Sequence, residues 1–374
     1  MRAAVNVTVI GAGALGCSAA LSLAEAGHSV RLLERHAVGS GNSAKAAGIL
    51  SSFAWNDAEY RLIAETRGAV GELIALAMAA GERNAKGAWR SAPSLCIGGG
   101  ESLPLLGQLQ DRVERHTEEC ERLDHRRAAA EFPGLRFTPG EEVLVAQEDG
   151  VLEAGDLFAA FRARLDQEGV EVVTGRDVSD LHIPGADAVV VAGGAWTKGL
   201  LERNGVRLPL QCYRTQLASL AIPGAEGLPI LHDLTQHFYA RPESDASILV
   251  GDGTQLRPFD PEAYDEVADP EFIHAVAERV VHRFEDGAEA TVRSGWAGLC
   301  VATPDRRPVC GPVPGRPGLF VLTGDNGFGL MRCLALGNRL AEAVKGKVAP
   351  DLDPGRFGPD APLEFTMREG YGAP

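Results

Sequence analysis

Three glycines near the N-terminus have the spacing of a turn that holds the phosphates of a dinucleotide. Gly11, Gly13 and Gly16 form a GxGxxG pattern. The first glycine allows the turn, the second lets the backbone approach a pyrophosphate, and the third lets helix and strand pack closely. Glu34 ends the next strand-like run, where a carboxylate can accept ribose hydroxyls and would repel the 2′-phosphate of NADP. We therefore predict an adenine dinucleotide site, with a merely structural glycine turn as the alternative.

Two further glycine-rich elements could contact the same ligand. Ala192, Gly193 and Gly194 end an apolar run at 187–194, and TGDNGFGLM at 323–331 leads from a strand into a helix. A helix N-terminus directed at the N1–C2=O edge of a flavin would stabilise the reduced ring. The alternatives are an ordinary strand-to-helix turn at the first element and a helix capped by Asn326 at the second.

The elements that position these motifs alternate between strand and helix patterns. Apolar runs predict strands at 5–10, 29–34, 170–173, 187–194 and 318–324, with helices following Gly16, at 154–168 and at 327–345. Amphipathic or charge-rich patterns predict helices at 56–80, within 101–131 and at 270–285, and short β runs fill 208–253.

This order predicts an α/β fold in which a Rossmann-like dinucleotide domain is discontinuous. We expect that domain to comprise 1–55, 146–207 and 296–374. A substrate domain of antiparallel β-sheet and helices, formed by 56–145 and 208–295, would be inserted in pieces.

Composition limits the classes of partner and compartment. The chain has 374 residues and a formal net charge of −15, which argues against nucleic acid or an anionic membrane as its main partner. Seven scattered cysteines without a CxxC pair predict no disulfide framework and no metal site. No run of 18 apolar residues occurs, so we expect a soluble, cytoplasmic protein.

Together, the motifs resemble those of the FAD-dependent D-amino acid oxidase superfamily, which includes glycine oxidase, sarcosine oxidase and amino acid dehydrogenases. They are GAGALG with Glu34, SAKAAGIL at 43–50, VVVAGGAW at 189–196, WAGL at 296–299, TPDRRPVCGP at 303–312 and TGDNGFG, in the family's order. Residues 55–145 and 210–290 match only diffusely.

The resemblance implies non-covalent FAD and a set of cofactor contacts. The pyrophosphate and adenosine would meet the first glycine turn, Glu34 and Arg35, while the flavin would lie against the loop after Ser43 and the turn before 331. The residues implied are Gly11, Gly13, Ala14, Leu15, Gly16, Glu34, Arg35, Ser43, Ala46, Ala47, Gly48, Ile49, Val178, Ala192, Gly193, Gly327, Phe328, Gly329 and Leu330.

The substrate side departs from the family pattern. Amino acid members carry an arginine, which binds the substrate carboxylate, where this chain has Cys300. Arg214, Arg241 and Arg332 are possible substitutes, with Tyr239 on the face of Arg241, and His237 could also line the pocket. A covalent link from Cys300 to FAD is a minor alternative.

The resemblance implies hydride removal from the carbon that bears an amine, with no obligatory protein acid or base. We expect oxidation of a small amine or amino acid, with O2 as acceptor and peroxide as product. The alternatives are a dehydrogenase that uses another acceptor, a non-catalytic FAD-binding protein, and an NAD-dependent dehydrogenase. The oligomeric state is not predicted.

Overall fold

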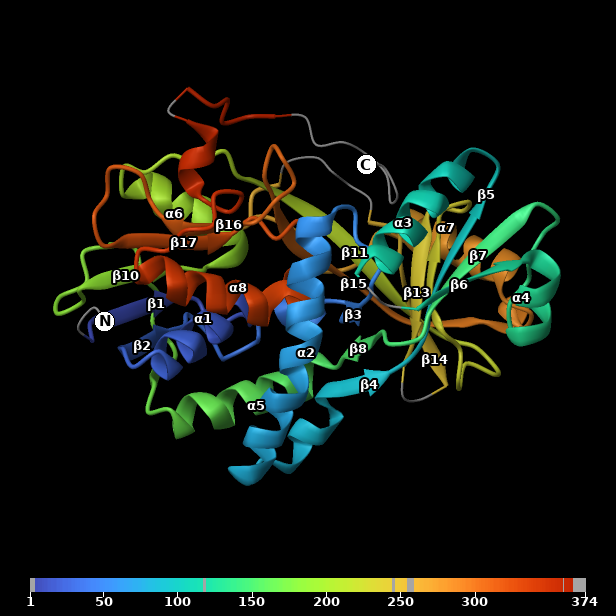
Figure 1. The fold of residues 1–374 in the computed structure, drawn as a ribbon, viewed down its shortest axis with the longest axis horizontal. Helices are drawn as coiled ribbons and strands as arrows, with labels where there is room; N and C mark the ends of the chain where they lie inside the picture. The colour runs from blue at the N-terminus through green and yellow to red at the C-terminus, as the bar shows by residue number, and fades with distance from the viewer. Residues whose placement is uncertain (1–3, 117–118, 244–245, 254–258, 359, 366–374) are drawn as a thin grey trace.

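The protein is described by a computed structural model that covers residues 4–116, 119–243, 246–253, 259–358 and 360–365. Two lobes are visible in Figure 1, each built around one large sheet. None of the described helices is long and apolar enough to cross a membrane.

A six-stranded, mainly parallel sheet forms the first lobe. Its strand order is β16 (Val309–Pro312), β17 (Leu319–Thr323), β10 (Ala188–Val191), β1 (Asn6–Ile10), β2 (Ser29–Leu33) and β9 (Glu171–Val173). All pairs are parallel except β16 with β17. The strands come from three separate stretches of chain, so segments distant in sequence build one sheet.

Side chains alternate across this sheet because the strand period is two residues. Val7 and Val9 enter the core that contains α1 (Ala14–Glu25), α2 (Asp57–Ala79), α5 (Ala154–Gln167) and α8 (Gly329–Val344). Ile10 enters the core on the other face, with residues of α6 (Thr197–Arg203) and β15 (Thr291–Ala302). The sheet is therefore covered on both faces, as parallel sheets require.

An eight-stranded sheet forms the second lobe. It has the order β15, β11 (Gln211–Ala221), β14 (Ser247–Gly251), β13 (Phe238–Pro242), β12 (Ile230–Asp233), β5 (Ser94–Gly99), β7 (Glu141–Ala146) and β6 (Cys120–Asp124). The pairs are antiparallel except β12 with β5. Helix α7 (Pro270–Arg283) packs on one face and α3 (Leu103–Arg115) on the other.

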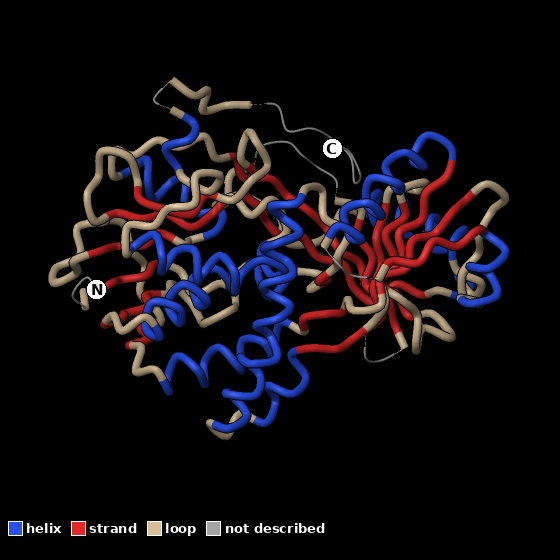
Figure 2. Tube along the Cα trace, in the orientation of Figure 1, coloured by secondary structure: helices blue, strands red, loops and turns tan. Residues whose placement is uncertain are grey.

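A three-stranded sheet of β3 (Ile49–Leu50), β8 (Gly150–Leu152) and β4 (Trp89–Ser91) lies between the two lobes (Figure 1). Figure 2 shows α1, α2, α5 and α8 gathered on one side of it and most strands of the eight-stranded sheet on the other. The predicted fold class is confirmed; the domain boundaries stay a prediction.

The prediction of helices within 101–131 is wrong in part, because a strand interrupts them. The charge-rich stretch 101–131 contains α3 and the short α4 (His125–Glu131), but strand β6 separates them. Pairing with the edge of β7, from Cys120 opposite Ala146 to Asp124 opposite Glu142, holds this segment extended. Tertiary pairing has overridden the local helical pattern.

Candidate active site

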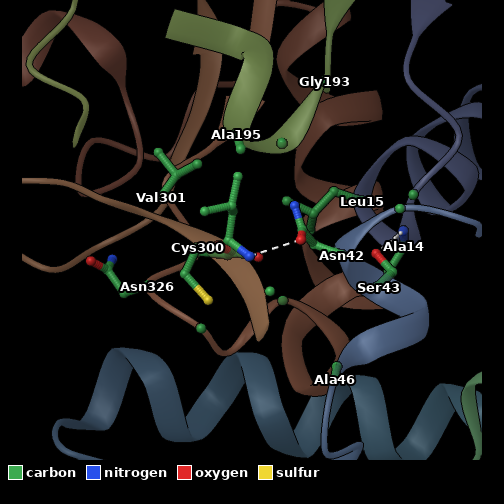
Figure 3. Close-up of a pocket in the computed structure, with 18 of the residues that line it drawn as sticks. Ala14, Leu15, Asn42, Ser43, Ala46, Gly193, Ala195, Cys300, Val301 and Asn326 are labelled. Carbon is green, nitrogen blue, oxygen red and sulfur yellow. Dashed lines mark hydrogen bonds between the residues drawn. The ribbon is translucent and has the colours of Figure 1, made fainter. Parts of the chain in front are cut away.

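A continuous cavity of about 1000 Å³ runs from the glycine turn after β1 to strands β11, β13 and β15 of the second lobe. Figure 3 shows Ala14, Leu15 and Ser43 on one side of it and Cys300 and Asn326 on the other. The carboxyl ends of β1, β2 and β10 reach it, which is where ligands bind in open α/β sheets.

The glycine turn brings three backbone segments into contact. Gly11 has φ +101°, and a Cβ there would lie 2.5 Å from the carbonyl oxygen of Ala192. A Cβ on Gly16 would lie 1.8 Å from the carbonyl oxygen of Gly11. Gly13 caps the N-terminus of α1 and supplies no side-chain cap. The N–H of Ala14 donates to Oγ of Ser43 at 3.1 Å. The N-terminus of α1 and that hydroxyl therefore meet the cavity together, at a position that favours an anion.

Glu34 fixes the rim of this turn. Its Oε2 accepts a 2.7 Å hydrogen bond from the N–H of Ala12, and its Oε1 accepts one of 2.8 Å from the N–H of His36. Arg35 stacks over the ring of Trp196 at 4.5 Å. Val178, which lines the same end, lies in the loop after β9.

The loop after β2 is tied to the second lobe. It contains a short 3₁₀ turn, η1 (Asn42–Lys45). The indole N–H of Trp296 donates to the carbonyl oxygen of Lys45 at 2.9 Å, and the N–H of Leu299 donates to Oδ1 of Asn42 at 2.7 Å. At Gly48, which has φ +70°, a Cβ would lie 2.1 Å from the carbonyl oxygen of Leu152. This loop therefore forms a fixed wall of the cavity.

The turn before α8 forms the opposite wall. The side chain of Asn326 accepts from the N–H of Thr303 at 3.3 Å and donates to the carbonyl oxygen of Gly324 at 2.8 Å. The N-cap of α8 is Phe328, without a side-chain cap. The alternative in which Asn326 caps the helix is therefore wrong, because its amide holds the turn instead.

Among the predicted cofactor contacts, the cavity lining includes all but Gly16, which is packed behind the turn. The described lining residues also include Tyr239 and Cys300 but not Arg214, His237, Arg241 or Arg332. Contact between the lining residues and a cofactor or substrate stays a prediction.

The three arginines are not among the described lining residues and form ion pairs instead, although Glu59, the partner of Arg332, does line the cavity. Arg214 pairs with Asp269 at 2.9 Å, Arg241 with Glu153 at 3.0 Å, and Arg332 with Glu59 at 3.5 Å. A buried guanidinium without a carboxylate is costly, and this accounts for their placement. His237 lies in the turn between β12 and β13 with φ 56°.

A polar group of side chains lines the cavity beside β11 and β15. Tyr213 and Cys300 are register partners on those two strands, and a Cβ on Gly327 would lie 3.2 Å from Oη of Tyr213 and 3.6 Å from Sγ of Cys300. Burial raises the pKa of the Cys300 thiol and lowers the pKa of His232 to about 4. Both groups are therefore neutral at pH 7.

Several lining residues were not predicted from the sequence. Tyr213, Thr215 and Leu217 alternate along β11 and share the cavity face. This alternation with a period of two residues could have been recognised in the sequence as one face of a strand. Asp325 belongs to a predicted motif but was not singled out. Asn42 meets a partner 257 residues away, and nothing local in the sequence indicates that contact.

Comparison with known proteins places the chain in a family. The family model described as FAD dependent oxidoreductase matches residues 6–343, so the chain belongs to the FAD-dependent oxidoreductase family. This finding favours FAD over the NAD-dependent alternative.

Similar proteins include two bacterial glycine oxidases. The one from Geobacillus kaustophilus is 26% identical over 93% of this chain and 95% of its own length. The one from Pseudomonas putida is 30% identical, but that match spans only 51% of this chain and 50% of the relative. The fold is similar to that of L-proline dehydrogenase from P. horikoshii, with a TM-score of 0.84, 19% identity, and 96% and 98% of the two chains covered.

Proposed function

We propose that this chain uses FAD to oxidise the C–N bond of a small amine or amino acid. The observation that carries the proposal is the continuous cavity that joins the glycine turn after β1 to the polar group around Tyr213 and Cys300. A dinucleotide long enough to reach from one to the other would bring its redox ring beside that group. The similarity to glycine oxidases supports an amine as the donor.

The residues present fit FAD. Side chains on Gly11 and Gly16 would collide with backbone, so the turn can be built only with glycine. The N–H of Ala14 donates to Oγ of Ser43 at 3.1 Å, so a pyrophosphate would meet that hydroxyl together with the N-terminus of α1. Gly11, Gly13 and Ala14 would hold that pyrophosphate, Glu34 the adenosine ribose, and the 43–49 loop with the 327–330 turn the flavin. Bound FAD supplies an acceptor for the hydride that leaves the substrate carbon.

The polar group would orient the substrate. The hydroxyls of Tyr213 and Tyr239 stay protonated because burial raises the pKa of each phenol, and they can hold an amine nitrogen by hydrogen bonds. Loss of hydride and a proton converts the amine to an imine. Water then releases a carbonyl compound and ammonia or a smaller amine.

Products and acceptor can be measured together. FAD-loaded protein incubated with a panel of primary and secondary amines and amino acids should form an aldehyde, ketone or keto acid, and peroxide in equal amount if O2 is the acceptor. Carbonyl product formed only with an added dye would make the chain a dehydrogenase. A flavin-loaded chain that forms no carbonyl product with or without dye would contradict the proposal.

We also propose that FAD is held non-covalently. Burial raises the pKa of the Cys300 thiol, and the charge of Asp325 raises it further. A protonated thiol is a poor nucleophile. Acid precipitation should release the flavin into the supernatant. Colour retained in the pellet of the parent protein but lost from that of Cys300→Ser would contradict this proposal.

A further inference from the structure

Three arginines near the substrate end of the cavity are already paired with carboxylates. Arg214, Arg241 and Arg332 lie close in the sequence to polar lining residues. Their side chains are only 3%, 7% and 1% exposed, and each forms an ion pair with an acid. Arg214 also points to the α7 side of the sheet, since it alternates with Tyr213 and Thr215 along β11. None of the three is therefore available to bind an anion in the cavity.

Lys45 is a cation that lines this end, and it too is paired. Its Nζ lies 2.8 Å from Oε1 of Glu266 and 2.8 Å from the hydroxyl of Tyr264. Arg35, Arg176 and Arg203 belong to the Glu34 end. The first two follow β2 and β9, and Arg203 ends α6, which begins directly after Trp196, the ring over which Arg35 stacks. Arg306, in the turn after β15, also lines the cavity and is tested separately below.

The same end carries an acid. Asp325 lines the cavity in the turn before α8, and a Cβ on Gly329 would lie 2.2 Å from its Oδ2. Burial raises the pKa of its carboxyl, although the charge of Arg332 opposes the shift. Near Asp325, the phenol of Tyr213 and the thiol of Cys300 carry no positive charge. The imidazole of His232, elsewhere in the lining, is neutral.

These charges determine which substrates the cavity can accept. A substrate carboxylate would lose its hydration without gaining one of these paired cations, and it would lie beside Asp325, which supplies no positive charge in either protonation state. An amine would instead meet hydroxyl groups and a carboxyl group. The hydroxyls can hydrogen-bond a neutral amine, and the ionised form of Asp325 can bind a protonated one. We propose that the physiological substrate is an amine that carries no carboxylate. This inference rests on the proposed function and narrows its substrate class.

Matched pairs that differ only by a carboxylate test the inference on the FAD-loaded protein. Pyrrolidine is compared with L- and D-proline, dimethylamine with sarcosine, and methylamine with glycine, in anaerobic mixing experiments that follow the flavin absorbance. The half-saturating concentration should be about tenfold or more lower for the carboxylate-free member, as expected where a charged hydrogen bond is missing. An equal or lower value for the amino acid would overturn the inference and leave the proposed function intact.

The outcome stays decisive if no pair reduces the flavin. Binding then still perturbs the flavin spectrum, and the same comparison of half-saturating concentrations applies to it. Absence of reduction across substrates of every class would count against the proposed function, whereas tighter binding of the carboxylated members would count against the inference.

Three substitutions locate the effect. Cys300→Arg places a guanidinium beside Tyr213 and should shift the ratio of half-saturating concentrations toward the amino acid by about tenfold. Cys300→Leu adds bulk without charge and should weaken both members alike. Arg306→Gln should leave the ratio unchanged. A selective loss of amino acid binding in that variant would identify Arg306 as a carboxylate anchor and overturn the inference.

Discussion

The backbone N–H of Leu299 donates a 2.7 Å hydrogen bond to Oδ1 of Asn42 (Figure 3). This contact joins the loop after β2 to strand β15, and it is reinforced by the bond from the Trp296 indole to the carbonyl oxygen of Lys45. The wall proposed to face the flavin and the wall proposed to face the substrate are thus fixed relative to each other.

Asn42→Ala should lower the free energy of unfolding by about 1–3 kcal/mol, because the partly buried N–H of Leu299 would lose its acceptor. Denaturant unfolding of the FAD-loaded protein measures the loss. Asn42→Asp keeps an acceptor oxygen and is the matched control. Equal stability of Asn42→Ala and the parent would show that this bond does not hold the loop to β15.

Glu34→Ala should raise the dissociation constant of FAD about tenfold or more, since a charged hydrogen-bond partner of the ribose and two bonds to the turn are lost together. Flavin fluorescence titration of the apoprotein gives the constant. Glu72→Ala, at an exposed position on α2, is the control and should bind FAD like the parent. Full flavin occupancy in Glu34→Ala would remove the assigned adenosine site.

Gly16→Ala should destabilise the fold by about 1–3 kcal/mol or more, because the new Cβ would overlap the carbonyl oxygen of Gly11. Gly68 offers a contrast: it lies in the exposed middle of α2, and a Cβ there would meet nothing within 4 Å. Gly68→Ala should leave stability unchanged or raise it by up to about 1 kcal/mol through helix propensity. The melting temperature should fall in Gly16→Ala and stay the same or rise in Gly68→Ala. Equal shifts in the two variants would contradict the packing described at the turn.

Arg283 anchors a buried ion-pair network in the second lobe. It lies 2.8 Å from both Asp233 and Glu141. Burial alone would raise the pKa of the Glu141 carboxyl, but hydrogen bonds from Arg283 outweigh it, and the pKa lies below its ordinary value. The pair therefore contributes stability above the unfolded-state pKa of about 4.3 and loses it as the pH falls through the folded-state value.

Arg283→Met should accordingly cost about 3–5 kcal/mol at pH 7, since two buried carboxylates lose their cation. The gap from the parent should narrow as the pH falls through about 4.3 and the Glu141 carboxyl is protonated. Urea unfolding across pH measures it. Arg31→Met, which removes an exposed pair with Glu171, should cost less than about 1 kcal/mol. A gap that stays constant down to acidic pH would refute the linkage.

Local sequence carries the dinucleotide half of the site. The spacing of Gly11, Gly13 and Gly16, the strand before them and Glu34 after the next strand fix one βαβ unit, and that unit folds as predicted. Each of these signals lies within a few residues of the structure it specifies, so periodicity and turn chemistry suffice.

The substrate half depends on contacts that the sequence does not indicate. Arg241 shares a strand face with Tyr239, yet its guanidinium reaches Glu153, 88 residues away. Arg214 points away from the cavity, because side chains alternate along β11 and Tyr213 faces the cavity. Had Tyr213 been predicted as a lining residue, the same alternation would have placed Arg214 on the opposite face. Strand β6 forms only because β7 is present to pair with it. Partners of this kind are chosen by the tertiary fold.

The central claim is that this chain uses bound FAD to oxidise an amine, and anaerobic mixing of the FAD-loaded protein with amines tests it most directly. The visible absorbance of the flavin should bleach with at least one amine and return when an electron acceptor is admitted. A flavin that stays fully oxidised with every primary and secondary amine and amino acid tried, while free flavin in the same solution is reduced by dithionite, would contradict it.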